Sequence, residues 1–301
     1  MKPVGKVVQL WRYPVKGMAG ESLSTCTVGA QGIEGDRIWA VWDTARQEVQ
    51  SCKYRPQLLL CSARLRQGPA VDFETTPLRG PDANGSTAAP ADITFPDGTS
   101  MGSDHPSVHD KVSALVGHAS RVEALRAPQQ EGFFKRYKAK GHDWRAELAA
   151  TFTREPGEPL PDLDNLPARA VQFVTIPGTF FLVAPLHIVT TATMEHFAAL
   201  RPKADWDIRR FRPNIVIQPL DGETGLVEQA WIGRTLVIGE AHFQCTETAP
   251  RCGAVTRPLE ELPKDASMLR TIVKHGDQNL GIYATTGDTH ALHVGAPVYV
   301  V

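Results

Sequence analysis

The sequence has no apolar run that approaches the ~18 residues of a membrane-spanning helix. It begins Met1-Lys2-Pro3-Val4-Gly5 and continues directly into a strand-like segment, without an apolar signal region. Its charges nearly cancel, with 32 Lys and Arg against 33 Asp and Glu. This balance argues against attraction of the whole protein to nucleic acid or to acidic membranes. We therefore predict a cytoplasmic protein with neither a membrane nor a nucleic acid as partner.

Cysteine is scarce, and the usual catalytic fingerprints are missing. The chain has five cysteines and no C-x-x-C pair, so it indicates neither a disulfide framework nor a tetrahedral zinc site. His105 and His109 have helical spacing but lack the glutamate of an H-E-x-x-H motif, which favours an ordinary surface pair. No P-loop, G-x-G-x-x-G or G-x-S-x-G motif occurs, so nucleotide-dependent and serine-hydrolase functions have no support.

What is present is a chain of 301 residues, a length that favours about two domains. Residues 1–125 are predicted to form a compact α+β domain. Its expected elements are strands at 4–13 and 38–43, a Pro-Asp-Gly hairpin at 93–101, and a helix at 106–115 capped by Ser103 or Asp104.

The second predicted domain, residues 126–301, opens with a polar, Pro-interrupted connecting segment at about 126–170 that includes one short helix at 144–152. Beyond it, short apolar segments and one helix predict a β-barrel-like unit. These are strands at 171–174, 180–183, 215–217, 236–238 and 298–300, and a helix at 193–200. The expected fold class is a β-rich α+β protein.

Two segments carry the strongest chemical signal. Arg212 and Asn214 head the apolar run 215–217, where side chains at i and i+2 can share one face of a strand. A guanidinium and an amide suit an anionic ligand that also offers donors and acceptors. About forty residues later, Cys252 lies between Arg251 and Gly253, and nearby positive charge favours the thiolate that binds metals.

Taken alone, these residues also allow plainer interpretations. An arbitrary cysteine is more often a small buried apolar residue, and an arginine before a strand is more often solvated. We interpret Arg209 and Arg210 as part of a solvated face and leave them out of the predicted site. Cys26, Cys52, Cys61 and Cys245 show no local charge pattern that activates a thiol, so we predict structural burial for them.

The two segments resemble the MOSC family, which includes the C-terminal domain of molybdenum cofactor sulfurases and the amidoxime-reducing components. Further family-like segments occur in family order: Tyr13-Pro14-Val15-Lys16, Gly35-Asp36-Arg37, Thr190-Thr191, Leu280-Gly281-Ile282-Tyr283-Ala284 and Val294-Gly295. The resemblance implies an N-terminal α+β MOSC-type domain packed on a MOSC β-barrel domain. It also implies the molybdenum-molybdopterin cofactor, with Cys252 as the molybdenum ligand and catalytic residue.

The resemblance further implies cofactor-binding roles for Lys16, Arg37, Thr190, Thr191, Arg212, Asn214 and Arg251. For the two threonines, a plain helix N-cap is an equal alternative to a phosphate contact, and both can hold at once. The chain departs from the amidoxime-reducing members at two positions. Gly17 replaces a common serine and keeps its N–H, whereas Pro250 replaces a small polar residue and has none.

The implied function is a molybdenum-dependent oxidoreductase that reduces N-hydroxylated small molecules such as amidoximes and hydroxylamines. The sequence has no C-x4-C-x2-C iron–sulfur motif and no dinucleotide fingerprint. Electrons are therefore expected from an external donor, a flavin reductase with an iron–sulfur or haem carrier.

The alternative function is a cofactor carrier or sulfur-transfer binding module without its own turnover. In cofactor sulfurases the MOSC domain is fused to a pyridoxal-phosphate desulfurase, for which this chain has no room, so pyridoxal phosphate binding enters only as a family-level term. A degenerate fold with an empty pocket is the least attractive alternative, because Cys252, Arg212, Asn214, Lys16 and Arg37 are all present.

Overall fold

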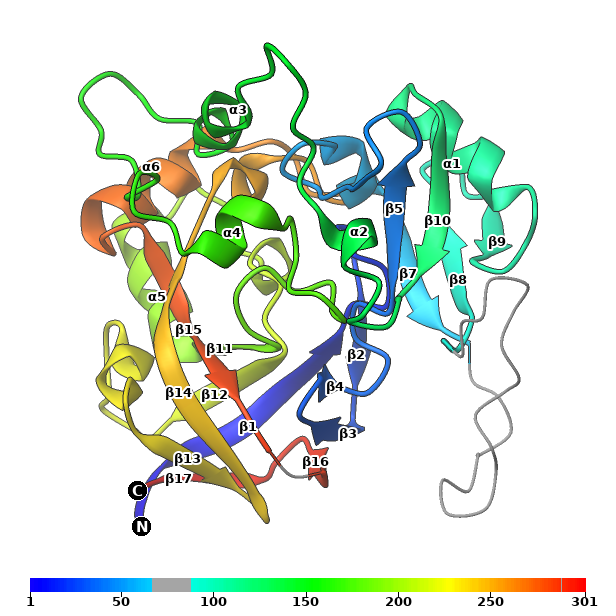
Figure 1. Ribbon diagram of the computed structural model, residues 1–301. Helices are drawn as coiled ribbons and strands as arrows, with labels where there is room; N and C mark the ends of the chain where they lie inside the picture. The colour runs from blue at the N-terminus through cyan, green and yellow to red at the C-terminus, as the bar shows by residue number, and fades with distance from the viewer. Residues whose placement is uncertain (67–87, 288) are drawn as a thin grey trace, which may run out of the picture.

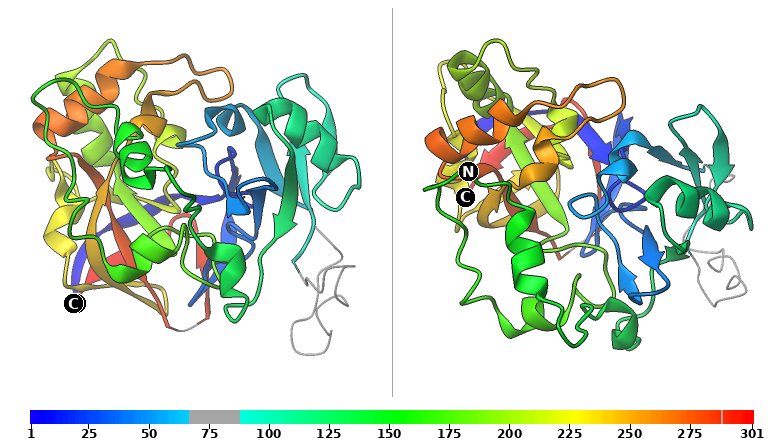
Figure 2. Two further views of the ribbon diagram at one scale, coloured as in Figure 1. Left: turned by 45° about the horizontal axis from the view of Figure 1, so that its top comes forward. Right: turned by 90° about the horizontal axis from the view of Figure 1, so that it is seen from above.

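The computed structural model describes residues 1–66, 88–287 and 289–301. The protein is a β-rich α+β structure, which confirms the expected fold class (Figure 1). A closed barrel lies beside a smaller group of sheets and helices from the N-terminal part of the chain, and Figure 2 shows the two side by side. The predicted boundary at residue 125 stays a prediction.

Seven strands close the barrel in the order β12-β11-β15-β14-β13-β17-β1, and β1 pairs back to β12. They are β1 (Lys2–Arg12), β11 (Leu186–Thr190), β12 (Ile215–Pro219), β13 (Thr235–Ile238), β14 (Ala241–Pro250), β15 (Asn279–Thr285) and β17 (Pro297–Val300). All neighbours are antiparallel except β11 and β12, which α5 (Thr191–Leu200) connects as a parallel crossover. The expected strands at 4–13, 215–217, 236–238 and 298–300 are thus confirmed, as is the helix at 193–200.

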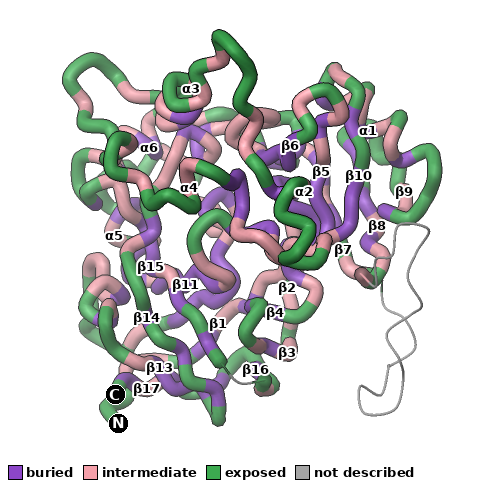
Figure 3. Tube along the Cα trace, in the orientation of Figure 1, coloured by how far each residue is buried: buried purple, intermediate pink, exposed green. Residues whose placement is uncertain are grey.

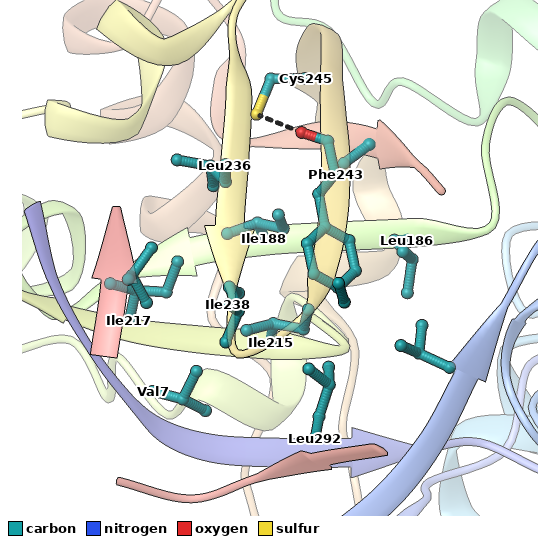
Figure 4. Packing of buried hydrophobic residues seen from close by; sticks show 14 of the residues in the cluster. Val7, Leu186, Ile188, Ile215, Ile217, Leu236, Ile238, Phe243, Cys245 and Leu292 are labelled. Carbon is teal, nitrogen blue, oxygen red and sulfur yellow. Dashed lines mark hydrogen bonds between the residues drawn. The ribbon is translucent and has the colours of Figure 1, made fainter. Parts of the chain in front are cut away.

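The barrel interior is filled by side chains that alternate along each strand. Ile215 and Ile217 point inward from β12, and Leu236 and Ile238 do so from β13, because residues two apart share a face of a strand. Figure 4 shows them packed with Phe243 of β14. The C-terminal end of β1 continues beyond the barrel, where residues 10–12 pair with β2 (Glu21–Leu23).

Two helices cover the outside of the barrel next to β11 and β15. Phe197 of α5 and Ile272 of α6 (Ala266–His275) pack with Val189 and Leu280, whose side chains face outward. Within residues 1–66, 88–287 and 289–301, four short 3-10 helices complete the connections: η1 (Pro56–Leu60), η2 (Ile208–Arg210), η3 (Val227–Trp231) and η4 (Gly253–Thr256). In the part of the chain that the structure describes, no helix has both the length and the apolar character needed to cross a membrane.

Among the described residues, the N-terminal lobe contains two small sheets and a helix. The sheets are β10-β5-β6 and β7-β8-β9, built from β5 (Trp39–Asp43), β6 (Glu48–Val49), β7 (Ser62–Leu65), β8 (Ala91–Thr94), β9 (Ser100–Gly102) and β10 (Ser120–Ala124). A further sheet, β16-β3-β4, consists of β3 (Thr25–Gly29), β4 (Gly32–Ile33) and β16 (His290–His293), and its Val28, Ile33 and Leu292 pack into the barrel core. Helix α1 (Val108–Val116) buries Val108, Val112 and Val116, which lie four residues apart on one face.

The predicted strand at 38–43 and the hairpin at 93–101 are confirmed by β5 and by the β8–β9 pair. The predicted cap of α1 is wrong. Ser107 occupies the N-cap position without a side-chain hydrogen bond, while the Ser103 hydroxyl accepts a hydrogen bond from the N–H of Ala91 at 2.9 Å. The Ser103 side chain therefore serves the neighbouring strand.

The connecting segment carries α2 (Glu131–Phe134), α3 (Trp144–Ala150) and α4 (Ala168–Gln172), and much of it is exposed (Figure 3). Helix α3 confirms the short helix expected at 144–152. The strands expected at 171–174 and 180–183 are wrong. The first segment overlaps α4 and contributes one isolated bridge between Phe173 and Lys135, and the second is irregular. Apolar runs become strands only where a partner strand is available, and neither run has a partner ladder among the described residues.

One glycine is required by the packing of β11 against β15. Gly281 has φ +84, and a Cβ added there would overlap the His187 ring and lie 2.7 Å from the Ile188 carbonyl oxygen. Gly281→Ala should lower the free energy of unfolding by about 2–5 kcal/mol, combining left-handed backbone strain with overpacking. Urea unfolding measures this change. Gly233→Ala is the control, because Gly233 has a similar φ of +79 and open space around it; equal losses at both positions would contradict the packing argument.

Candidate functional site

A cavity of about 200 Å³ lies where the loops of the N-terminal lobe meet one end of the barrel. Its walls come from segments far apart in sequence: the turn after β1, the approach to β5, the loop after β6, the segment before β11, the approach to β12, and the end of β14. Six of the eight predicted site residues line it, namely Lys16, Arg37, Arg212, Asn214, Arg251 and Cys252. The structure thus brings together residues that the sequence separates by more than two hundred positions.

Cys252 stands directly after β14, at the N-cap position of η4. It is half-buried, free of any disulfide, and part of the cavity wall. The next residue fixes its position: the Gly253 N–H donates to the Thr151 carbonyl at 2.8 Å. A Cβ on Gly253 would lie 2.9 Å from that same oxygen, so the close approach of α3 and η4 depends on glycine.

Positive charge dominates the cavity. Its wall contains the cationic side chains Lys16, Arg37, Lys53, Arg210, Arg212 and Arg251, and no carboxylate among the described lining residues. Such a site attracts anions, and low-dielectric walls strengthen the attraction. The prediction that Arg210 belongs to a solvated face is wrong. Arg210 is 5% exposed, and its guanidinium donates to the carbonyls of Asp205, Arg257 and Pro263.

Arg37 and Arg212 lie on the same tyrosine ring. Their guanidinium carbons are 4.9 and 4.3 Å from the ring centroid of Tyr13, a cation–π arrangement. Both arginines have left-handed backbones, with φ of 51 and 56. The strand starts at Ile215 as expected, and Arg212 lies before it. Non-glycine residues in this region carry strain, which tends to be retained where function requires it.

The guanidinium of Arg212 is only partly satisfied. Its Nη1 donates to the Met18 carbonyl, whereas its buried Nη2 has no hydrogen-bond partner among the described residues. Buried donors in folded proteins nearly always have an acceptor, so this unpaired N–H group points to an acceptor supplied by a ligand.

Lys16 is a strongly perturbed cation of the cavity. The side chain is 5% exposed, and its Nζ donates to the Phe180 carbonyl at 2.7 Å. Burial, followed by repulsion from Lys53 and Arg37, lowers the pKa of Lys16 to about 7. The Lys16 amine therefore has its pKa close to neutral pH and no carboxylate partner among the described residues, so a bound anion would favour its charged form.

The amide of Asn214 is occupied within the protein. Its Oδ1 accepts from the His187 N–H at 3.2 Å, and its Nδ2 donates to Asp36 at 3.1 Å and to the Trp11 carbonyl at 3.3 Å. Arg251 is similarly engaged, because it donates to the carbonyls of Ala249 and Phe211 and to the Tyr283 hydroxyl, all within 3.2 Å. Both residues line the cavity while they hold its walls.

Thr190 and Thr191 are not brought to the cavity. Thr190 is the N-cap of α5, where its hydroxyl accepts from the Thr193 N–H at 3.2 Å and donates to the buried carboxyl of Glu228 at 2.6 Å. Thr193 donates to the same carboxyl oxygen at 2.6 Å, and burial raises the pKa of Glu228. The N-cap interpretation thus describes the geometry of Thr190, and the phosphate contact of both threonines stays a prediction.

Sequence reasoning missed the loop after β6 as part of the site. Cys52 and Lys53 line the cavity, although Cys52 was expected to be structural and Lys53 was not considered. Burial raises the pKa of the Cys52 thiol and lowers that of Lys53, and each responds to the charge of Cys252. No local pattern distinguishes these residues, because only the packing of this loop against the barrel brings them to the site.

Cys61 and Cys245 are buried as expected, whereas Cys26 is half-buried. Burial raises the pKa of the thiols of Cys26, Cys61 and Cys245 to about 12. The described part of the chain has no cluster of three or more His, Cys, Asp or Glu side chains that could hold a metal ion. His105 and His109 instead accept hydrogen bonds from the N–H groups of Ser107 and Val122.

The perturbed lysine predicts a pH dependence of stability. The pKa of Lys16 falls from its usual 10.5 in the unfolded chain to about 7 in the fold. Between these two values the unfolded chain binds more protons, so the free energy of unfolding should rise as pH increases through this window. Urea unfolding of ligand-free protein across the window should show this rise in the wild type and lose it in Lys16→Met. Lys2→Met, at an exposed position, should keep the wild-type slope; the same slope in Lys16→Met would contradict the assignment.

Comparisons with known proteins agree with the arrangement of the chain. The model of the MOSC N-terminal beta barrel domain matches residues 4–113, and that of the MOSC domain matches residues 177–299. No curated protein matches the chain.

Three solved structures are similar to parts or all of it. YiiM from Geobacillus stearothermophilus is 16% identical with a TM-score of 0.29, and YiiM from Escherichia coli is 12% identical with a TM-score of 0.28; each match covers 39% of this chain. The chain spans about half the length of these two proteins, 54% in both cases. The YUAD protein from Bacillus subtilis is 10% identical with a TM-score of 0.41, and the match covers 99% of this chain and 95% of that protein.

Together, the two domain matches account for most of the sequence, and the chain belongs to the MOSC family, with a MOSC N-terminal beta barrel domain followed by a MOSC domain.

Proposed function

We propose that this protein is a molybdenum cofactor-binding oxidoreductase that reduces N-hydroxylated compounds, such as amidoximes and hydroxylamines, with electrons from a separate donor protein. One observation carries the proposal: the free thiol of Cys252 shares a cavity with six cationic side chains and with no carboxylate among the described lining residues. A thiolate ligand and a cationic cradle are what a metal bound to an anionic organic cofactor requires.

The residues of the cavity fit the molybdenum-molybdopterin cofactor. Cys252 would supply the soft thiolate ligand, and the unpaired Nη2 of Arg212 would find its missing acceptor on the cofactor. Lys16 and Lys53 lack a carboxylate partner among the described residues and would neutralise the phosphate, while Arg37 borders the same space. When bound, the cofactor supplies a two-electron redox centre, and the protein supplies position and charge.

Asn214 and Arg251 would contribute by holding these groups in place. Asn214 ties the turn before β12 to Asp36, and Arg251 ties the end of β14 to Phe211. Side chains whose own geometry is fixed by hydrogen bonds position a site more precisely than freely rotating ones.

The charge of the cavity also suits the change in charge during the reaction. Reduction of an amidoxime consumes two electrons and two protons and releases an amidine and water. The amidoxime is neutral, whereas the amidine is a strong base that is protonated at neutral pH. Repulsion by the cations of the wall therefore favours release of the product.

Cys252 tests the metal assignment. Cys252→Ser should abolish turnover and remove one sulfur from the X-ray absorption signature of the metal, because serine offers a harder oxygen ligand. Cys245→Ser is the matched control, since Cys245 lies in the barrel core, and it should change neither readout. An unchanged sulfur shell in Cys252→Ser would rule out this residue as the ligand.

The electron source gives a second test. The sequence contains no iron–sulfur or dinucleotide motif, so purified protein should reduce a model amidoxime with reduced viologen and remain inactive with reduced nicotinamide alone. Steady-state assays with each donor measure the difference. Robust turnover driven by nicotinamide alone would refute the need for a donor protein. Inactivity with every low-potential donor, despite full molybdenum occupancy, would favour a cofactor carrier.

A further inference from the structure

The segment Phe180–Pro185, between α4 and β11, has an unusual surface for the edge of a cationic cavity. It contains no charged residue. Two of its side chains, Leu182 and Val183, line the cavity and are 48% and 41% exposed. The other large apolar side chains that are exposed in the described residues lie outside the cavity wall: Met1, Leu160, Leu200, Leu220, Val294 and Val301.

The exposure of this pair is imposed by its neighbours. Phe180 is fully buried, and its carbonyl accepts the hydrogen bond of Lys16. Phe181 is 6% exposed, its ring lies 5.5 Å from the Arg37 guanidinium carbon, and its carbonyl accepts from the Ile176 N–H at 3.1 Å. With these two residues fixed by the cations of the site, the chain presents Leu182 and Val183 at the edge of the cavity.

We propose that Leu182 and Val183 form an apolar lip that selects neutral N-hydroxylated substrates with an apolar substituent, such as alkyl or aryl amidoximes, over hydroxylamine itself. This inference rests on the proposed function and names its substrate class. The N-hydroxyl end of the substrate enters the cavity that contains Cys252, and the substituent covers the lip.

The chemistry of the wall favours this class. The cations of the wall that the anionic cofactor leaves unneutralised disfavour a positively charged substrate. An uncharged amidoxime avoids the repulsion, and its alkyl or aryl group removes the exposed surface of Leu182 and Val183 from water. Each methylene buried contributes ~0.8 kcal/mol, which corresponds to about a fourfold change in affinity.

The test measures binding without turnover. Straight-chain alkyl amidoximes of increasing length are titrated by calorimetry into cofactor-loaded protein that receives no electron donor. For the wild type we expect Kd to fall by about fourfold per methylene until the lip is covered. The double variant Leu182→Asn/Val183→Thr should lose this dependence on chain length, and the single variant Val183→Thr should lose part of it. Leu200→Asn, which alters an exposed leucine outside the cavity wall, should retain it.

Addition of reduced viologen then separates the two proposals. If the lip acts on substrate binding, the double variant should raise KM for long-chain amidoximes far more than it alters kcat. A wild-type Kd that is independent of chain length, or an equal slope in the double variant, overturns the lip. Chain-length-dependent binding without reduction by any donor, at full molybdenum occupancy, overturns the reductase function and leaves the lip as a binding feature.

Discussion

The carboxylate of Asp36 joins the segments from which the cavity is built. It accepts the Tyr13 N–H at 2.7 Å and the Asn214 amide at 3.1 Å, and it pairs with Arg37. These three partners come from the end of β1, the turn before β12 and the approach to β5. Because a buried carboxylate must be compensated by donors on all sides, the three segments can meet in only one arrangement. That arrangement places Tyr13 beneath Arg37 and Arg212, so one acid sets the position of two cations.

How much of the fold and of the candidate site can be predicted from the sequence depends on whether the partners of a residue lie near it or far from it along the chain. The apolar runs at 215–217 and 236–238 predicted β12 and β13 correctly, because each run has partner strands in the barrel. The run at 180–183 is equally apolar, yet its neighbours are a lysine, an arginine and open solvent rather than another strand. Strand propensity states only that a side chain fits a half-buried pleated surface, and tertiary contacts decide whether such a surface exists.

The candidate site divides in the same way. The prediction that Cys252 and Arg212 share one site came from family-like segments. No sequence pattern marks Lys53 and Cys52 as site residues, because a loop from a distant part of the chain brings them to the cavity. Thr190 illustrates the opposite case. A threonine before a helix has a local partner in the N–H three residues on. Its hydroxyl also donates a hydrogen bond to the buried carboxyl of Glu228, which no local pattern reveals.

The path of β1 has a consequence for the order in which the molecule assembles. Residues 2–12 pair with residues 215–219 and 297–300, so β1 completes its barrel ladders only with strands far along the chain. The sheets between residues 39 and 124 draw all their strands from that stretch and can form before β12 and β17 are synthesised. Until then, the barrel ladders of β1 cannot form. Loop closure over such distances is slow, and an exposed strand edge in the interval is open to wrong partners. The cavity, whose walls come from both sides of this closure, is therefore complete only after β1 has paired with β12.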